Sequence, residues 1–216
     1  MKFNCKCIKP SFTNKKYSYW ENRRTTSDEK DIINKISNDK NLIDKNILHI
    51  GIGNSELAQK LDSSNNIFGI TISNNEIENA NSLKLINYKI FFCDKYSLNF
   101  EKTFKNHKFD LIIDTNLKSY TCCQNAFDYM MEKLFNFLNH EGQIITSTNG
   151  MKWFKSLKPK LSFNFKSFFY YKMKEISGNP NNILNEAELK KLCSVYGIKI
   201  LFDENLCYLI KWKKKR

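Results

Sequence analysis

The 216-residue sequence has only three prolines and seven glycines, and it does not gather them with serine into a linker. It also lacks internal repeats, and no apolar run approaches the ~18 residues of a membrane span. The segment Met1–Cys7 lacks the apolar core of a secretory signal. We therefore expect one domain over residues 1–216, with no membrane association and a cytoplasmic location.

The cysteines do not form a recognisable metal or disulfide pattern. There are seven, an odd number, and no two Cys-x-x-Cys pairs stand with histidines at zinc spacing. Cys5 and Cys7 are an alternative soft-metal pair, but a lysine separates them and no further ligand is evident. We expect reduced thiols and no metal site.

The net charge of +13 raises the question of nucleic-acid binding. Lysine and arginine gain affinity for RNA by displacing counterions from phosphates. The lysines here are scattered over almost every segment, and scattered charge is usually a solvated surface. RNA is therefore kept as an alternative partner and not as the first interpretation.

One segment has the pattern of a nucleotide-binding turn. The apolar run Ile47–Ile50 predicts a buried strand, and Gly51 and Gly53 allow a tight turn that approaches a ligand. Ser55 is the expected cap of a helix that buries Leu57, Ala58 and Leu61. A dinucleotide fingerprint requires a third glycine, where this chain has Glu56, and an acid after the second strand, which ends in Thr71. NAD is therefore disfavoured.

Strand and helix patterns alternate along the rest of the chain. Apolar runs predict further strands at residues 67–71, 88–92, 109–114, 142–146, 198–202 and 206–212. Helical spacing and capping residues predict helices from Ser27, from Ser73, over residues 126–138 and from Asn185 to Gly197. This order indicates a mostly parallel sheet, and the final hairpin requires an antiparallel last strand.

The first motif, His49-x-Gly51-x-Gly53-x-Ser55, resembles that of the class I S-adenosylmethionine-dependent methyltransferases. Its Gly-x-Gly-Asn-Ser-Glu-Leu form is similar to the branch that includes elongation-factor lysine methyltransferases, as is the upstream Tyr19-Trp20 element. The resemblance covers residues 46–212. It implies a Rossmann-like α/β fold with about seven strands, an antiparallel last strand and helices on both faces, and it implies S-adenosylmethionine as cofactor.

The resemblance also assigns the cofactor-binding residues, which the carboxyl ends of parallel strands bring to one rim. The turn would face the methionine end, the second strand the ribose and Asp94 the adenine. Gly69-Ile70-Thr71-Ile72-Ser73 is similar to a form found in cyclopropane fatty acid synthases, in which a residue five places after the threonine assists. Lys95 and Tyr96 would flank the adenine ring. The implied contacts are His49, Gly51, Gly53, Asn54, Ser55, Thr71, Ile72, Glu76, Asp94, Lys95, Tyr96 and Asp114.

Three of these residues have structural alternatives. His49 stands where the family has an acid, and it is alternatively a core histidine. Glu76 has a second role in a capping box with Ser73, and Asp94 could simply begin a polar turn.

The acceptor side is assigned by the same resemblance. Asp114 would lie near the transferable methyl group and orient or deprotonate an amine, and Tyr19, Trp20 and Tyr120 would line the acceptor. Residues 1–45 would form an N-terminal cap, and residues 149–184 an insertion over the substrate. We expect a methyltransferase acting on a small molecule or protein amine. The alternatives are a non-catalytic cofactor-binding protein and an RNA-binding module on the same fold.

Overall fold

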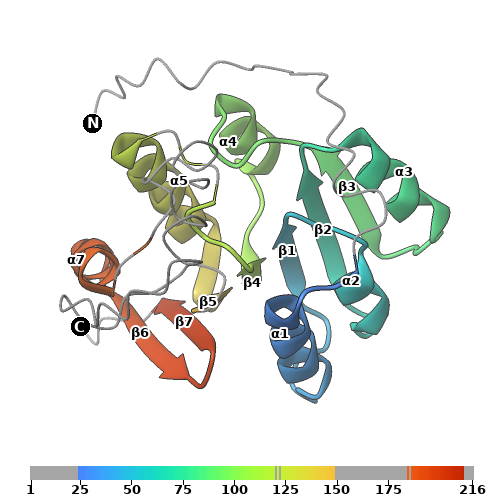
Figure 1. The fold of residues 1–216 in the computed structure, drawn as a ribbon, viewed down its shortest axis with the longest axis horizontal. Coiled ribbons are helices and arrows are strands. Elements are labelled where there is room, and N and C mark those ends of the chain that lie inside the picture. The colour runs from blue at the N-terminus through green and yellow to red at the C-terminus, as the bar shows by residue number, and fades with distance from the viewer. Residues whose placement is uncertain (1–23, 120, 122, 149–183, 185, 212–216) are drawn as a thin grey trace, which may run out of the picture.

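The computed structural model describes residues 24–119, 121, 123–148, 184 and 186–211. Its centre is a seven-stranded sheet of order β3-β2-β1-β4-β5-β7-β6 (Figure 1). The strands are β1 (Asn46–Ile50), β2 (Asn66–Thr71), β3 (Tyr88–Phe92), β4 (Phe109–Asp114), β5 (Leu138–Ser147), β6 (Ile198–Asp203) and β7 (Leu206–Lys211). The first five run parallel, and β7 pairs antiparallel with both β5 and β6, as expected from the sequence.

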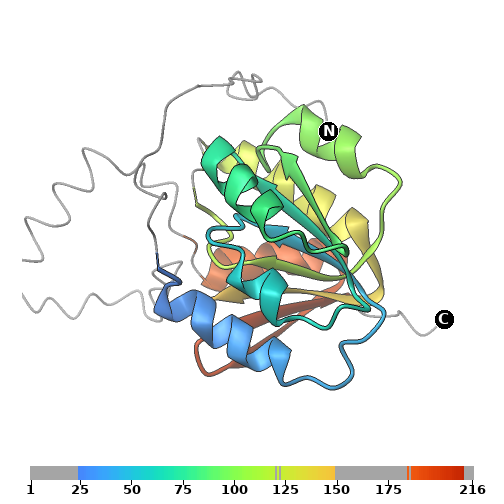
Figure 2. The same cartoon turned by 90° about the vertical axis from the view of Figure 1, so that its right-hand side faces the viewer.

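Helices cover both faces of this sheet (Figures 1 and 2). The helices are α1 (Ser27–Ser37), α2 (Glu56–Lys60), α3 (Asn74–Ser82), α4 (Leu98–Phe104), α5 (Gln124–Phe137) and α7 (Glu186–Tyr196). Alternate residues of each strand serve opposite faces, so Ile47 packs with α1, α2 and α3, whereas Leu48 packs with α4, α5 and α7. Burial on both faces explains the nearly continuous apolar runs.

The helix ends follow their local sequence. Thr26 caps α1 in a reciprocal capping box with Glu29, and Ile32, Ile33 and Ile36 are buried as predicted. At the other end of the fold, Lys211 donates to the carbonyls of Phe135 and Leu138, where α5 ends.

Two regions differ from the sequence-based expectation. Helix α4 was not predicted; Ser97 caps it, and Phe100 and Phe104 bury one side of it. Strand β5 begins at Leu138, a residue assigned to the preceding helix, and not at Gly142. Its register with β4 shifts after Phe109, and a side chain at Gly142 would meet the Phe109 carbonyl at 2.8 Å.

Among the described residues, no helix is long and apolar enough to cross a membrane.

Candidate functional site

The predicted rim forms beside β1, where the strand order of the sheet reverses. Strand β1 pairs with β2 on one side and β4 on the other, and Ile50 lies opposite both Ile70 and Asp114. The chain therefore leaves β1 between two diverging connections, which is the place where open α/β sheets bind ligands. The glycine turn begins there, held by the bond from the Gly51 amide to the Ile70 carbonyl (2.9 Å).

The turn needs backbone conformations that glycine adopts easily. Gly51 has φ of 75° and Gly53 of 52°, both left-handed. Ser55 also has φ of 60°, so it occupies a third position that favours glycine. Ser55 is the N-cap residue of α2, as predicted, but its side chain makes no capping bond to the helix. The Ser55 hydroxyl instead lies 3.3 Å from the Tyr88 hydroxyl.

Tyr88 reaches the turn from β3 by passing across β2. A Cβ added at Gly69 would stand 2.7 Å from the Tyr88 hydroxyl and 2.8 Å from its ring. Because Gly69 has no side chain, Tyr88 can cross β2 at this point and contact Ser55. Burial raises the pKa of the Tyr88 hydroxyl. This support was not predicted from the sequence.

The end of β2 joins the start of α3 through two predicted residues. The Thr71 hydroxyl donates to the Glu76 carboxylate at 2.6 Å and accepts from the Ser73 amide at 3.0 Å. The Ser73 hydroxyl caps α3 by accepting from the Glu76 amide. Glu76 thus places a buried carboxylate beside Thr71, where most dinucleotide sites have an acid at the strand end. Ile72 follows with an exposed side chain.

Asp94 lies beyond β3 and is exposed. Its carboxylate accepts from the Tyr96 amide at 2.9 Å, so it does begin a turn, and adenine binding stays a prediction. That Lys95 and Tyr96 flank the adenine likewise stays a prediction. Both are buried, and the Tyr96 hydroxyl donates to the Ser119 carbonyl. Their side chains are fixed by the loop after β4.

Lys95 is the centre of a polar cluster behind the rim. Its ammonium lies 2.7 Å from Asp114 Oδ2 and donates to the carbonyls of Asn116 and Leu117 at 3.1 Å. Lys95 is 7% exposed and Asp114 3%. Both carboxylate oxygens of Asp114 are engaged, Oδ2 by the ammonium and Oδ1 by the Asn116 amide, so this geometry favours a positioning role for Asp114 over proton abstraction. A general-base role would require the pair to open.

His49 has an unusual environment at the end of β1. It is 4% exposed, and its Nδ1 has no hydrogen-bond partner. Burial lowers the pKa of His49 to about 4, while the nearby Glu29 carboxylate acts in the opposite direction. At neutral pH the imidazole is therefore uncharged. It faces α1 and α2, on the side of the sheet opposite Ile50.

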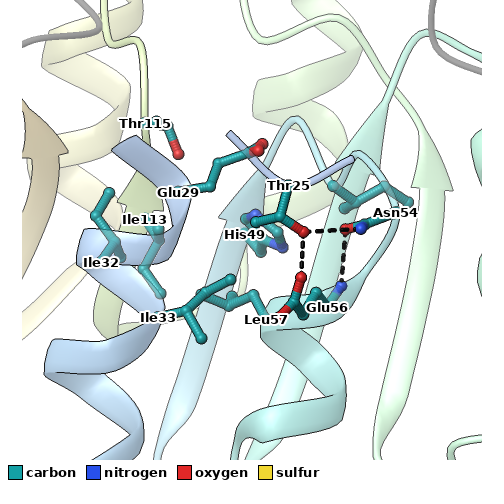
Figure 3. A pocket seen from close by; sticks show the side chains of 11 residues that line it. Thr25, Glu29, Ile32, Ile33, His49, Asn54, Glu56, Leu57, Ile113 and Thr115 are labelled. Carbon is teal, nitrogen blue, oxygen red and sulfur yellow. Dashed lines mark hydrogen bonds between the residues drawn. The ribbon is translucent and has the colours of Figure 1, made fainter. Parts of the chain in front are cut away.

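A cavity opens at His49 between α1 and the turn (Figure 3). The cavity has a volume of about 10 Å3, which is room for a group the size of one water molecule or one ammonium, and it is partly open to solvent. The lining residues are Thr25, Glu29, Ile32, Ile33, His49, Ile52, Asn54, Glu56, Leu57, Ile113 and Thr115.

Thr25 connects the segment before α1 to the turn. Its hydroxyl accepts from Asn54 Nδ2 at 2.8 Å and donates to the Glu56 carboxylate, and the Glu56 amide donates back to Asn54 Oδ1 (Figure 3). The sequence analysis did not assign Thr25, Glu29 or Glu56 to the site. Ser27 and the acids Asp28 and Glu29 predicted the helix start but gave no sign that Glu29 lines a cavity.

The remaining predicted residues lie outside the described part of the chain. Tyr19, Trp20, Tyr120 and nearly all of the 149–184 insertion belong to this group, so the acceptor side stays a prediction. Within the described ranges, no group of three or more histidine, cysteine or acidic residues is placed to hold a metal ion.

Comparisons with known proteins agree with this geometry. The family model described as a methyltransferase domain matches residues 43–198. A comparison with curated protein sequences found no match.

Solved structures share the fold at low sequence identity. An O-methyltransferase family protein from Burkholderia thailandensis aligns with a TM-score of 0.61 and 9% identity, over 87% of this chain and 57% of that one. The N-methyltransferase NodS from Bradyrhizobium japonicum WM9, in complex with S-adenosyl-L-homocysteine, gives 0.58 and 10%, over 94% and 95%. Magnesium protoporphyrin IX methyltransferase from Synechocystis PCC 6803, also with S-adenosylhomocysteine bound, gives 0.56 and 15%, over 91% and 93%. These likenesses confirm the predicted fold class.

Proposed function

Because this chain belongs to the methyltransferase-domain family, we propose that it transfers a methyl group from S-adenosylmethionine to a small-molecule or protein amine. The observation that carries the proposal is the rim at the carboxyl ends of β1, β2 and β3. A left-handed glycine turn, a buried Thr71–Glu76 pair and the exposed Asp94 follow these adjacent strands in that order.

The order of these groups matches the three parts of the donor. The turn and the cavity at His49 would hold the amino-acid end, the Glu76 carboxylate would lie beside the ribose hydroxyls, and Asp94 would accept from the adenine amino group. When bound, the donor supplies an electrophilic methyl group on a positively charged sulfur. The chain need only align the acceptor with that group, because direct displacement does not require a covalent intermediate.

The Lys95–Asp114 pair supports an alignment mechanism. It fixes the loop after β4 at the point where the family places the acceptor. An amine would attack with its own lone pair and release its proton to water after transfer. The chain holds the amine in line with the methyl group, and such alignment supplies much of the rate enhancement of reactions of this kind.

An amine is favoured over RNA as the acceptor because of how charge is distributed along the sequence. The net charge is +13, but the lysines are scattered over almost every segment, which is typical of a solvated surface and not of an RNA-binding patch.

Donor binding is tested by calorimetry with S-adenosylhomocysteine and with NAD. We expect the first to bind and NAD to give no heat, since Glu56 stands where the dinucleotide fingerprint has its third glycine. NAD binding more tightly than S-adenosylhomocysteine would overturn the assignment.

Transfer is tested by incubating the purified protein with methyl-labelled donor and a cell extract. The extract is then divided into protein, RNA and small-molecule fractions. We expect label in the protein or small-molecule fraction, suppressed by excess S-adenosylhomocysteine as the control. Label in RNA alone would overturn the acceptor class, and no label despite tight donor binding would make this a non-catalytic binding protein.

A further inference from the structure

We propose that Glu29, on α1, binds the ammonium group of the donor's amino-acid end, in place of the acid that the family motif has at position 49. The inference rests on the proposed function, because it concerns one end of the same donor. It assigns a ligand-binding role to a helix that lies outside the family's first motif.

The first observation is the state of His49. Its ring lines the cavity, is almost completely buried and leaves Nδ1 without a partner. A buried polar atom normally has a hydrogen-bond partner, so Nδ1 keeps a hydrogen-bonding position that a bound group could fill. Since the ring is neutral, it can accept a hydrogen bond from an ammonium group but cannot balance its charge.

The second observation is the position of Glu29. Its Oε1 lies 3.5 Å from the point where a Cβ on Gly53 would stand, so the carboxylate sits directly against the glycine turn. Figure 3 shows Glu29 and His49 facing the same space from α1 and β1. The negative charge absent from β1 is therefore present across the cavity.

The Glu29 carboxylate is also held in place before any ligand arrives. Its Oε2 accepts from the Thr26 amide at 2.8 Å and from the Thr26 hydroxyl at 3.0 Å. A carboxylate fixed in this way loses little conformational entropy on binding. Glu29 thus combines charge, position and rigidity at one end of the site.

Glu56 is the rival acid in the same cavity. Its carboxylate accepts from the Thr25 hydroxyl, and it stands in the first turn of α2. It therefore already serves to connect α2 to the segment before α1. Glu29 is the acid whose negative charge acts to raise the pKa of His49.

The test compares two ligands by calorimetry at neutral pH. S-adenosylhomocysteine carries the ammonium group, whereas 5′-methylthioadenosine lacks the whole amino-acid end. Glu29→Gln should weaken binding of S-adenosylhomocysteine by about ten- to a hundredfold and leave methylthioadenosine unchanged. Glutamine also completes a capping box, so the helix is retained, as circular dichroism would verify.

Two further variants make the result specific. Asp28→Asn removes a charge from the same helix turn but does not line the cavity, and it should bind both ligands as the wild type does. Glu56→Gln should have the smaller effect of the two cavity variants. The proposal is overturned if Glu29→Gln binds S-adenosylhomocysteine normally, or if Glu56→Gln alone loses the preference for it. If the wild type binds neither ligand, the proposed function itself fails.

Discussion

Replacing Lys95 with methionine should strongly destabilise the fold, because it leaves the Asp114 carboxylate buried without its counter-charge. The ammonium at 2.7 Å is the charge partner of Asp114, and both side chains are more than nine-tenths buried. Removing one partner of a buried ion pair costs about 3–5 kcal/mol. The variant also loses the bonds from the ammonium to the carbonyls of Asn116 and Leu117, which places it at the upper end of that range.

The assay is urea-induced unfolding at pH 7, followed by circular dichroism, with Lys35→Met as the matched control. Lys35 pairs with Asp203 at the same 2.7 Å distance, but the two side chains are 55% and 42% exposed. An exposed pair is screened by solvent and contributes little to stability, so this control should unfold near the wild-type midpoint. Because the two ion pairs have the same length, comparing the two variants shows the effect of burial on stability.

A second variant distinguishes lost pairing from lost packing. Lys95→Met combined with Asp114→Leu removes both charges, and apolar replacement of a buried pair is often close to neutral. The double variant should therefore recover most of the stability that Lys95→Met loses. The reasoning is refuted if Lys95→Met destabilises by less than about 1 kcal/mol, or if the double variant is no more stable than the single one.

The remaining predictions concern three other buried positions. The His49 pKa of about 4 lies below its unfolded value near 6.5. The contribution of His49 to the free energy of unfolding is therefore complete above pH 6.5 and is lost as the pH falls towards 4. Over that pH range the stability curves of wild type and His49→Phe should diverge by up to about 3 kcal/mol. Gly69→Ala should destabilise by about 1–3 kcal/mol in thermal unfolding, because its methyl group meets the Tyr88 ring, and an unchanged midpoint would contradict the packing. Thr71→Val should cost about 1–3 kcal/mol in urea by removing a donor to the Glu76 carboxylate, while Thr71→Ser should stay near wild type; equal losses would implicate the methyl group instead.

Much of the fold could be predicted because its strands are buried on both faces. Continuous apolar runs fixed β1 to β4 to within one residue, and Gly197 marked the end of α7 with φ of 65°. Helix α4 was missed because its seven residues are too few for a clear period. The start of β5 was missed because the polar residues 139–141 interrupt it, next to a register shift that only the pairing with β4 reveals.

The candidate site was predictable only where contacts are local in sequence. Thr71 and Glu76 stand five residues apart, and the structure brings them together as expected. Lys95 and Asp114 were each singled out, but their pairing depends on two strand ends meeting across β1 and β2. Glu29 was not assigned to the site because its closeness to the turn comes from packing of α1 on the sheet, which no spacing encodes.

The position of β7 in the sheet has a consequence for synthesis of the chain. β7 lies between β5 and β6, although the ribosome makes it after both. Until β7 emerges, residues 143–147 of β5 have no partner on that side and form an open edge with unpaired amides and carbonyls. The nascent chain thus exposes an unpaired strand edge after β1 to β4, the strands of the proposed donor site and its neighbours, have been synthesised. Pairing with β7 closes that edge, so a chain truncated before residue 206 should expose β5 as a site for aggregation.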